Sequence, residues 1–197
     1  MNAAKFNAPS ASMEDIEYHP DRNLDKQLMI ELRTGNYIKE HHNIILMGAS
    51  CNGKIWVSNA LGTQACRQFN KGRYIRLPEL LDELVVAKNA ADGSFRKIIQ
   101  RYQKIELLIL HEWLLTELSL EQTTYILEII EARPKKLSTI FCFQFALEGW
   151  YTKLGQAQIA DAILDRIVHG SYKFLIDRSI SMRERHGLNH RENSASI

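Results

Sequence analysis

The stretch MGASCNGKI, residues 47–55, constrains the fold of this chain more than any other part of the sequence. Gly48, Gly53 and Lys54 have the spacing GxxxxGK, in which backbone N–H groups wrap phosphates and the lysine reaches their outer oxygens. The apolar run NIILM (43–47) precedes the loop, and apolar residues at helical spacing follow it. This predicted order of strand, loop and helix favours a phosphate site over the alternative, an ordinary turn.

Four more segments have the composition of strands: RYIRL (73–77), IELLILHEW (105–113), STIFCFQF (138–145) and SYKFLI (171–176). Segments with helical spacing lie between them, among them 78–88, 119–133 and two helices within 146–169, and an amphipathic helix is expected from Asp21 to near Gly35. Strands that alternate with helices predict a doubly wound α/β fold with a parallel sheet. A chain of 197 residues is expected to form one such domain.

Composition excludes several classes of protein. Hydrophobic residues make up 45% and charged residues 24% of the chain, and no apolar run is long enough to span a bilayer. The N-terminus has no secretory signal, so we expect a cytoplasmic protein. The three cysteines form no CxxC pair and indicate reduced thiols. A net charge of +2 allows contact with an acidic polymer but does not argue for one.

The run LLILHE (107–112) is a second candidate for chemistry. In P-loop ATPases a buried strand ends in an Asp that supports Mg²⁺, and a Glu often follows and orients the attacking water. Glu112 has the position of that glutamate, whereas His111 has the position of the aspartate. A zinc protease of the HExxH type is excluded, because position 115 is leucine.

At this point nearly the whole chain resembles a known family, the AAA+ domain of IstB-like transposition helper ATPases, which are relatives of DnaC-type helicase loaders. The most diagnostic blocks are RLPELLDEL, ADAILDRIVH and SMR. The resemblance implies a three-layer α/β/α P-loop fold with a five-stranded parallel sheet in the order 5-1-4-3-2. Family members usually carry a further N-terminal helical region, most of which we expect this chain to lack.

The resemblance also implies roles for individual residues. Glu112 would orient water, Gln144 would lie at or beside the first sensor, with Phe143 in place of a small polar residue, and Arg166 would be the arginine finger offered to a neighbouring subunit. Arg183 would be the second sensor at the γ-phosphate. The expected nucleotide-binding loop comprises Gly48, Ala49, Ser50, Cys51, Asn52, Gly53, Lys54 and Ile55.

Two residues depart from the family pattern, and both affect one ion. Ile55 replaces the Ser or Thr whose hydroxyl binds Mg²⁺, and His111 replaces the Asp that supports it. Mg²⁺ prefers hard oxygen ligands, which neither side chain supplies. We therefore expect ATP or ADP to bind with weak or absent Mg²⁺, and we expect impaired hydrolysis.

The sequence thus predicts an ATP-binding helper of DNA transposition that assembles as a homo-oligomer on double-stranded DNA and engages a transposase. Two alternatives stay open: a DnaC-like loader of a replicative helicase, and a non-catalytic P-loop interaction module. The expected organisation is a mobile lead-in over residues 1–20, an AAA+ domain over 21–183 and a polar tail over 184–197.

Overall fold

A computed structural model describes residues 4–133, 135–144, 149–176 and 182–185, without the side chains of Arg183 and Arg185. Its centre is a sheet of five parallel strands in the order β2-β3-β4-β1-β5. This order, read from the other edge, is the expected 5-1-4-3-2, so the predicted parallel α/β sheet is confirmed. The strands are β1 (Asn43–Met47), β2 (Gly72–Arg76), β3 (Leu107–His111), β4 (Ser138–Cys142) and β5 (Ser171–Leu175).

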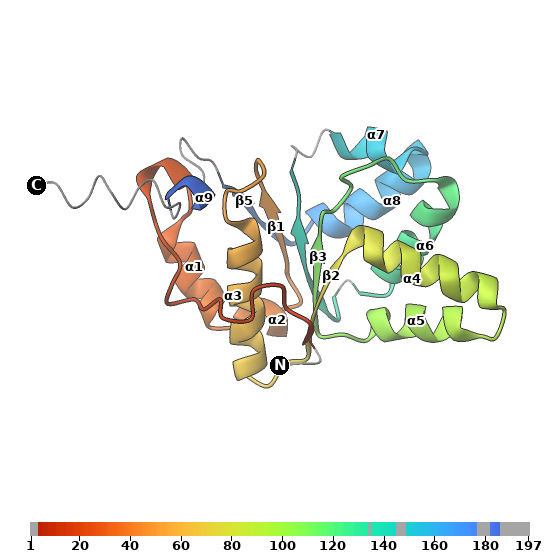
Figure 1. The fold of residues 1–197 in the computed structure, drawn as a ribbon, viewed down its shortest axis with the longest axis horizontal. Coiled ribbons are helices and arrows are strands. Elements are labelled where there is room, and N and C mark those ends of the chain that lie inside the picture. Colours follow the sequence, from red (N-terminus) through yellow and green to blue (C-terminus); the bar gives the residue numbers. More distant parts are fainter. Residues whose placement is uncertain (1–3, 134, 145–148, 177–181, 186–197) are drawn as a thin grey trace, which may run out of the picture.

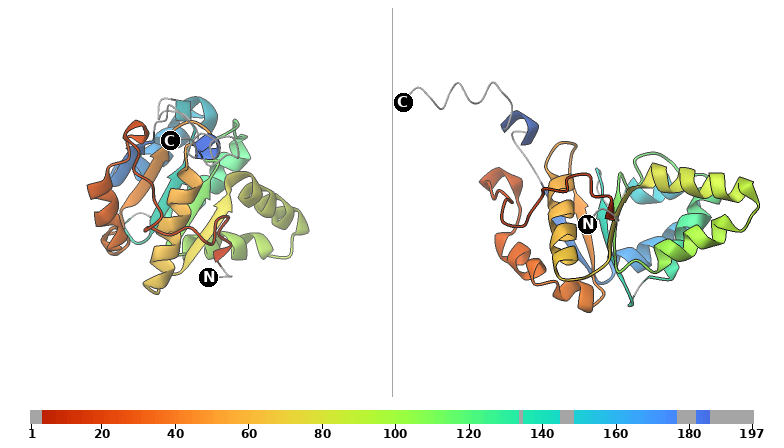
Figure 2. Two further views of the ribbon diagram at one scale, coloured as in Figure 1. Left: turned by 60° about the vertical axis from the view of Figure 1, so that its left-hand side comes forward. Right: turned by 60° about the horizontal axis from the view of Figure 1, so that its bottom comes forward.

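Helices cover both faces of the sheet and complete three layers (Figure 1). The two further views agree on this arrangement (Figure 2). One face carries α1 (Lys26–Arg33), α2 (Asn36–Lys39) and α3 (Lys54–Arg67). The other face carries α4 (Leu77–Ala90), α5 (Ser94–Gln103), α6 (Leu120–Glu131), α7 (Trp150–Leu154) and α8 (Ala157–Val168). The short η2 (Pro20–Arg22) and α9 (Met182–Arg185) complete the described elements, and none of these helices is long and apolar enough to cross a bilayer.

The helix expected from Asp21 to Gly35 is wrong as a single element. Asp25 ends the preceding coil and caps α1, because its side chain accepts hydrogen bonds from the backbone N–H groups of Gln27 and Leu28 at 2.8 and 3.1 Å. Residues with short polar side chains favour such caps over helix interiors. The local cap therefore separates η2 from α1, which ends at Arg33 close to the expected end near Gly35.

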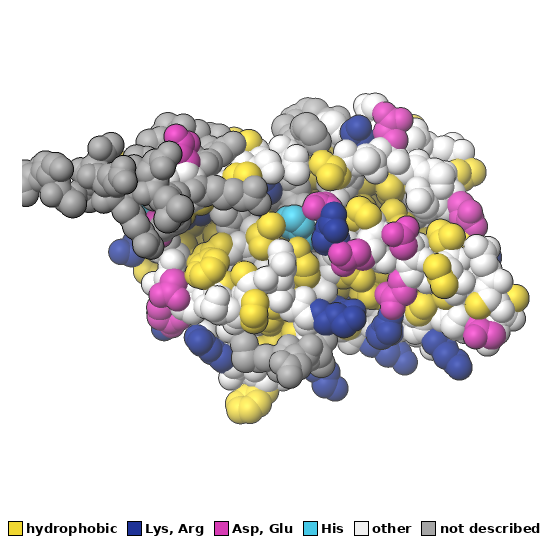
Figure 3. Space-filling model, in the orientation of Figure 1, with side chains coloured by type: hydrophobic (Ala, Val, Ile, Leu, Met, Phe, Trp, Pro, Cys, Tyr) yellow, Lys and Arg dark blue, Asp and Glu magenta, His cyan; other side chains and the backbone are white. Residues whose placement is uncertain are grey.

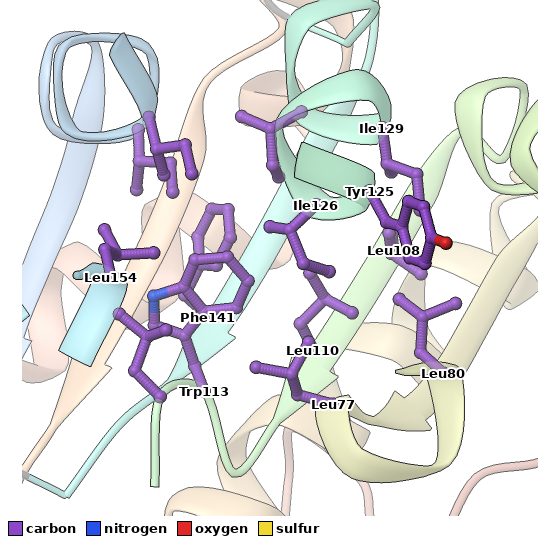
Figure 4. Close-up of a cluster of buried hydrophobic side chains, with 14 of the residues drawn as sticks. Leu77, Leu80, Leu108, Leu110, Trp113, Tyr125, Ile126, Ile129, Phe141 and Leu154 are labelled. Carbon is purple, nitrogen blue, oxygen red and sulfur yellow. The ribbon is translucent and has the colours of Figure 1, made fainter. Parts of the chain in front are cut away.

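Alternate residues of each central strand enter opposite cores, as strand geometry requires. In β3, Leu108 and Leu110 pack under α4 and α6, whereas Leu107 and Ile109 face α3. Figure 4 shows the first of these cores, where Leu108, Leu110 and Phe141 of the sheet meet helix residues such as Leu80 and Ile126. Each fully buried Leu or Ile contributes about 1.5–3 kcal/mol, so the sheet is held from both faces.

A coil over residues 4–19 crosses α3 before η2 begins (Figure 1). The side chains of Ala11, Met13 and Ile16 are buried in the core on the α3 face, and the Ala8 N–H donates to Asn59 Oδ1 of α3 at 3.3 Å. Much of the segment expected to be a mobile lead-in, residues 1–20, thus packs against the domain.

A buried arginine joins the end of α6 to two strands. Arg133 is 2% exposed and donates hydrogen bonds to the carbonyl oxygens of Tyr102, Ile105 and Ser138 at 2.6 to 2.9 Å, and to Thr139 Oγ1 at 2.8 Å. Burial lowers the pKa of this guanidinium to about 9. The side chain therefore ties α5, β3 and β4 together at the amino edge of the sheet.

Candidate functional site

The phosphate loop joins β1 to α3 at the carboxyl edge of the sheet. Gly48 has φ +138°, and a Cβ atom there would lie 2.3 Å from the carbonyl oxygen of Ile176. Gly53 has φ +87°, in the left-handed region that favours glycine. Both glycines of the GxxxxGK spacing are thus required by the backbone path of this loop.

Lys54 begins α3, and its side chain folds back over the loop. Its Nζ atom donates to the carbonyl oxygens of Gly48 and Ala49 at 2.6 and 2.7 Å, and to Asn52 Oδ1 at 3.1 Å. The residue is only 6% exposed. The ammonium group is therefore held beside the N-terminus of α3. The helix dipole and the free backbone N–H groups at this end favour an anion in the same place.

Three contacts from distant parts of the chain hold the loop in place. The Asn52 side-chain amide donates to the carbonyl oxygen of Ile176, which follows β5. Arg22, which is 3% exposed, donates to the carbonyl oxygen of Asn52 at 3.3 Å, and the Met182 N–H donates to that of Cys51 at 3.1 Å. The loop is thus fixed from η2, β5 and α9.

A cavity of about 400 Å³ opens over this loop. It brings together most of the residues that the sequence singled out, including Glu112 after β3 and Gln144 after β4. Phe143 points to the other side, because its ring is fully buried against Trp150 at 4.7 Å between ring centroids. The predicted residues that line the cavity are Ser50, Cys51, Asn52, Gly53, Lys54, Ile55, Glu112 and Gln144.

Glu112 is held by an arginine that the sequence analysis missed. Arg76, the last residue of β2, donates from Nε and Nη2 to Glu112 Oε2 at 2.9 and 2.7 Å. The bond to Glu112 raises the pKa of Arg76. Glu112 also has φ +55°, an uncommon backbone state for a residue with a side chain. The Glu112 carboxylate is therefore paired with the Arg76 guanidinium, and a water molecule would have to compete with Arg76 for a hydrogen bond to this carboxylate.

His111 is a neutral imidazole at the end of β3. Burial lowers its pKa from 6.5 to about 4, and the nearby Lys54 and Arg76 act in the same direction against an opposite effect of Glu112. Its ring stacks on that of Tyr74 with centroids 5.9 Å apart. Such a group carries no negative charge to support a cation at pH 7.

Mg²⁺ does not fit the residues that are present. Ile55 and His111 both line the cavity, and they offer an alkyl chain and a neutral ring where the ion needs oxygen. Among the described residues, no group of three or more His, Cys, Asp or Glu side chains is arranged to hold a metal ion. The loop and Lys54 can therefore receive phosphates, while Ile55 and His111 supply no oxygen ligand for the ion.

Of the other predicted residues, Gly48 and Ala49 do not line this cavity, and Arg166 lies apart from it. Arg166, near the end of α8, lines a separate cavity of about 640 Å³ with His41, His42 and Lys135, at the opposite edge of the sheet. It donates to Glu131 Oε1 at 2.7 Å. Arg183 belongs to α9, beside the loop-binding Met182, but its side chain lies outside the described residues.

A parallel sheet of this order, with a GxxxxGK loop between the inner strand β1 and α3, defines a P-loop domain. The chain belongs to the family of IstB-like ATP binding proteins, whose family model matches residues 1–190. It is 36% identical over 160 residues to the insertion sequence ATP-binding protein y4pL of Sinorhizobium fredii, which covers 81% of this chain and 64% of that protein. It is 39% identical over 141 residues to the ATP-binding protein of insertion sequence IS1162 of Pseudomonas fluorescens, covering 72% of this chain and 60% of that protein. The chain thus spans somewhat less than two thirds of the length of these two relatives.

Solved structures share the fold at low sequence identity. The DnaC helicase loader has a TM-score of 0.68 at 17% identity, covering 85% of this chain and 97% of that chain. The replication initiator DnaA bound to AMPPCP and single-stranded DNA has a TM-score of 0.66 at 14% identity, covering 86% of this chain and 51% of that chain. At these identities the likeness establishes the fold alone.

Proposed function

We propose that this chain binds ATP or ADP and acts as a helper in DNA transposition, assembling on duplex DNA and engaging a transposase. The loop from Gly48 to Lys54 is the observation that supports nucleotide binding. No side chain fits at Gly48, and Lys54 and the N-terminus of α3 face the same cavity as Glu112. Membership in the IstB-like family and likeness to insertion sequence ATP-binding proteins support the role in transposition.

The base of the nucleotide is assigned to a neighbouring cavity of about 380 Å³. Trp56 lines both this cavity and the one over the loop, and its side chain is partly exposed, at 37%. A flat aromatic ring beside a phosphate loop offers a stacking surface for a purine. The other residues of this cavity are Asp15, Glu17, Arg22, Gly53 and Met182.

Hydrolysis is expected to be slow. The backbone of the phosphate loop and Lys54 do not need the side chains of Ile55 and His111 in order to hold phosphates, so we expect nucleotide binding to be retained. The stabilisation of charge by Mg²⁺ does need oxygen ligands at these two positions, so we expect it to be lost. Losing about 4 kcal/mol of that stabilisation slows phosphoryl transfer roughly a thousandfold. The ion pair between Glu112 and Arg76 further occupies the carboxylate that would orient water. We propose Arg166 as the arginine finger. Gln144 would lie at or beside the first sensor, and Arg183 would be the second sensor.

Calorimetric titration of ATP and ADP into the protein, and into a Lys54→Ala variant, tests nucleotide binding. We expect the variant to lose all or most of the affinity, and we expect a Lys88→Ala variant, changed on α4, to keep it. Equal affinity of the parent and Lys54→Ala would refute phosphate binding by this loop and leave the non-catalytic interaction module.

Gel-shift titration with duplex DNA tests the second part of the proposal. Contacts between Lys or Arg and phosphates predict affinity at about 50 mM salt that falls steeply as salt rises. Capture of the transposase encoded beside the protein separates a transposition helper from a loader that captures a replicative helicase. Absence of DNA binding with nucleotide present would overturn the DNA part alone.

A further inference from the structure

Phe69 is an exposed aromatic residue in an unfavourable backbone state. It follows α3 with φ +68°, and 96% of it is exposed. Other large apolar residues at the surface, such as Ile30, Val86 and Leu120, belong to α-helices. The Phe69 and Asn70 N–H groups donate to the carbonyl oxygens of Cys66 and Ala65 at 3.1 and 3.0 Å, so the left-handed state is a common way for a helix to end. The helix end explains the backbone at this position, but it does not explain why an aromatic ring stands there almost fully in solvent.

The turn that carries Phe69 is surrounded by positive charge. Arg67 and Lys71 flank the ring in sequence and are exposed. The Leu107 N–H donates to the carbonyl oxygen of Lys71 at 3.1 Å, which brings the loop containing exposed Lys104 beside this turn. Figure 3 shows Lys and Arg side chains along the lower border of the molecule, where Figure 1 places the loop between α3 and β2.

Acidic groups offset this charge only in part. Glu106 accepts a hydrogen bond from the Lys71 backbone N–H, and Glu14 lies 3.5 Å from Arg67. The positive border continues along the amino edge of the sheet, because each loop that enters a strand lies at that edge. Lys135 and Lys136 before β4 are exposed lysines at this edge, and so is Lys39, the last residue of α2.

The size and charge of this surface decide what it fits. A stable protein interface buries about 800 Å² on each partner around an apolar core, whereas here a single aromatic ring stands among polar and charged side chains. A nucleic acid offers phosphates for the cations and bases for the ring, and apolar wedges or stacked aromatics are common in such contacts. We infer that the turn of residues 67–71, together with Lys104, binds DNA, with Phe69 against a base and Lys71 and Lys104 on phosphates. This inference rests on the DNA binding proposed above and assigns a surface to it.

The test compares the parent with Phe69→Ala, Lys71→Ala and Lys104→Ala by salt-dependent binding to duplex DNA that carries 2-aminopurine. We expect Phe69→Ala to weaken binding about tenfold with an unchanged salt dependence, because stacking is lost and the phosphate contacts stay. Each lysine variant should lower the slope of log K against log salt by about 1. The parent should raise 2-aminopurine fluorescence by unstacking the base, and Phe69→Ala should not.

Two controls isolate the turn. Val86→Ala removes another exposed apolar side chain, on α4, and should leave DNA binding unchanged, whereas Phe69→Trp should retain the affinity and the fluorescence signal. ATP affinity should be the same in all of these variants. A parent that binds DNA and a Phe69→Ala variant that binds it equally well would overturn this inference and leave the proposed function intact. Loss of transposase capture in Phe69→Ala, with DNA binding unchanged, would instead assign the ring to a protein partner and also overturn it.

Discussion

Ile55 and His111 are two residues whose individual chemistry limits the site. Both line the cavity over the phosphate loop, one from the start of α3 and one from the end of β3. Mg²⁺ requires a near-octahedral set of oxygen ligands. Oxygen-bearing side chains at both positions would complete this coordination shell, whereas one such side chain alone would not. The two residues therefore act as one unit with respect to the metal.

We predict that Ile55→Thr combined with His111→Asp raises the steady-state ATPase rate well above that of the parent, and that each single change raises it less. The rescue will be partial, because Arg76 still pairs with Glu112. The measurement is phosphate release with and without Mg²⁺, alongside Mg²⁺-dependent nucleotide affinity. A parent that already turns over rapidly, or a double variant whose affinity ignores Mg²⁺, would contradict this prediction.

The buried imidazole of His111 also predicts a pH dependence of stability. Its pKa is about 4 in the folded protein and 6.5 when solvated, so between these values the unfolded chain binds a proton that the folded chain does not. Stability therefore falls as the pH drops from 6.5 to 4, by about 2–3 kcal/mol from this residue. Urea unfolding of the parent and His111→Asn across this range should show a smaller loss in the variant. His169→Asn, at a side chain that is 81% exposed, should behave as the parent; equal losses in parent and His111→Asn would refute the assignment.

Single residues were predictable from the sequence only where spacing along the chain defines their role. The loop from Gly48 to Lys54 is such a case. The pair of Arg76 and Glu112 is not, because it forms across β2 and β3, whose register sets Arg76 opposite His111. Neighbouring parallel strands are separated in sequence by a whole helical crossover, so no local sequence pattern predicts the contact between Arg76 and Glu112.

At the scale of elements, strands were predicted more closely than helices. The three inner strands β1, β3 and β4 are short runs that are buried on both faces, and the predicted and observed segments of all five strands differ by a few residues at most at their ends. Helix boundaries depend on single caps instead. Asp25 starts a new helix, and Ser119 with Gln122 forms a capping box that fixes the start of α6. The first of these caps was not apparent among the other polar residues of the segment.

Arg133 gives a prediction about how elements are joined. Arg133→Met should destabilise the protein by about 3 kcal/mol or more, because three buried carbonyl oxygens and Thr139 Oγ1 lose their donor. Arg96→Met is the matched control, since the Arg96 side chain is 77% exposed and pairs with Glu128 at 3.4 Å, and it should cost less than about 1 kcal/mol. Urea unfolding measures both. Similar losses in the two variants would show that the buried network contributes no more than a surface ion pair.

At the scale of the whole molecule, the coil before α1 is part of the packed domain. We predict that Met13→Ala lowers the free energy of unfolding by about 2 kcal/mol or more, since this side chain is 6% exposed in the core beside α3. Leu120→Ala, at a residue that is 54% exposed, should cost far less. A neutral Met13→Ala variant would restore the expectation of a mobile lead-in over residues 1–20.

The packing of this coil could not be predicted, because residues 1–12 have no periodic pattern that distinguishes them from a tail. Its burial depends on small and apolar side chains that fit between α3 and neighbouring elements, and such fits arise only in three dimensions. The overall parallel α/β fold, in contrast, follows from the alternation of strands and helices along the chain.

The position of β1 inside the sheet has a consequence for synthesis of the protein. Ile44 pairs with Ile140 and Asn43 with Ser171, so the strand that carries the phosphate loop is made early but both its neighbours are made late. Contacts of such long sequence separation form slowly, because the ends of long loops must first meet. During translation the loop therefore leaves the ribosome without the strands that shape it. A nascent chain stopped before β4 would lack the cradle for a nucleotide, and ligand can stabilise the fold only after the last strand has emerged.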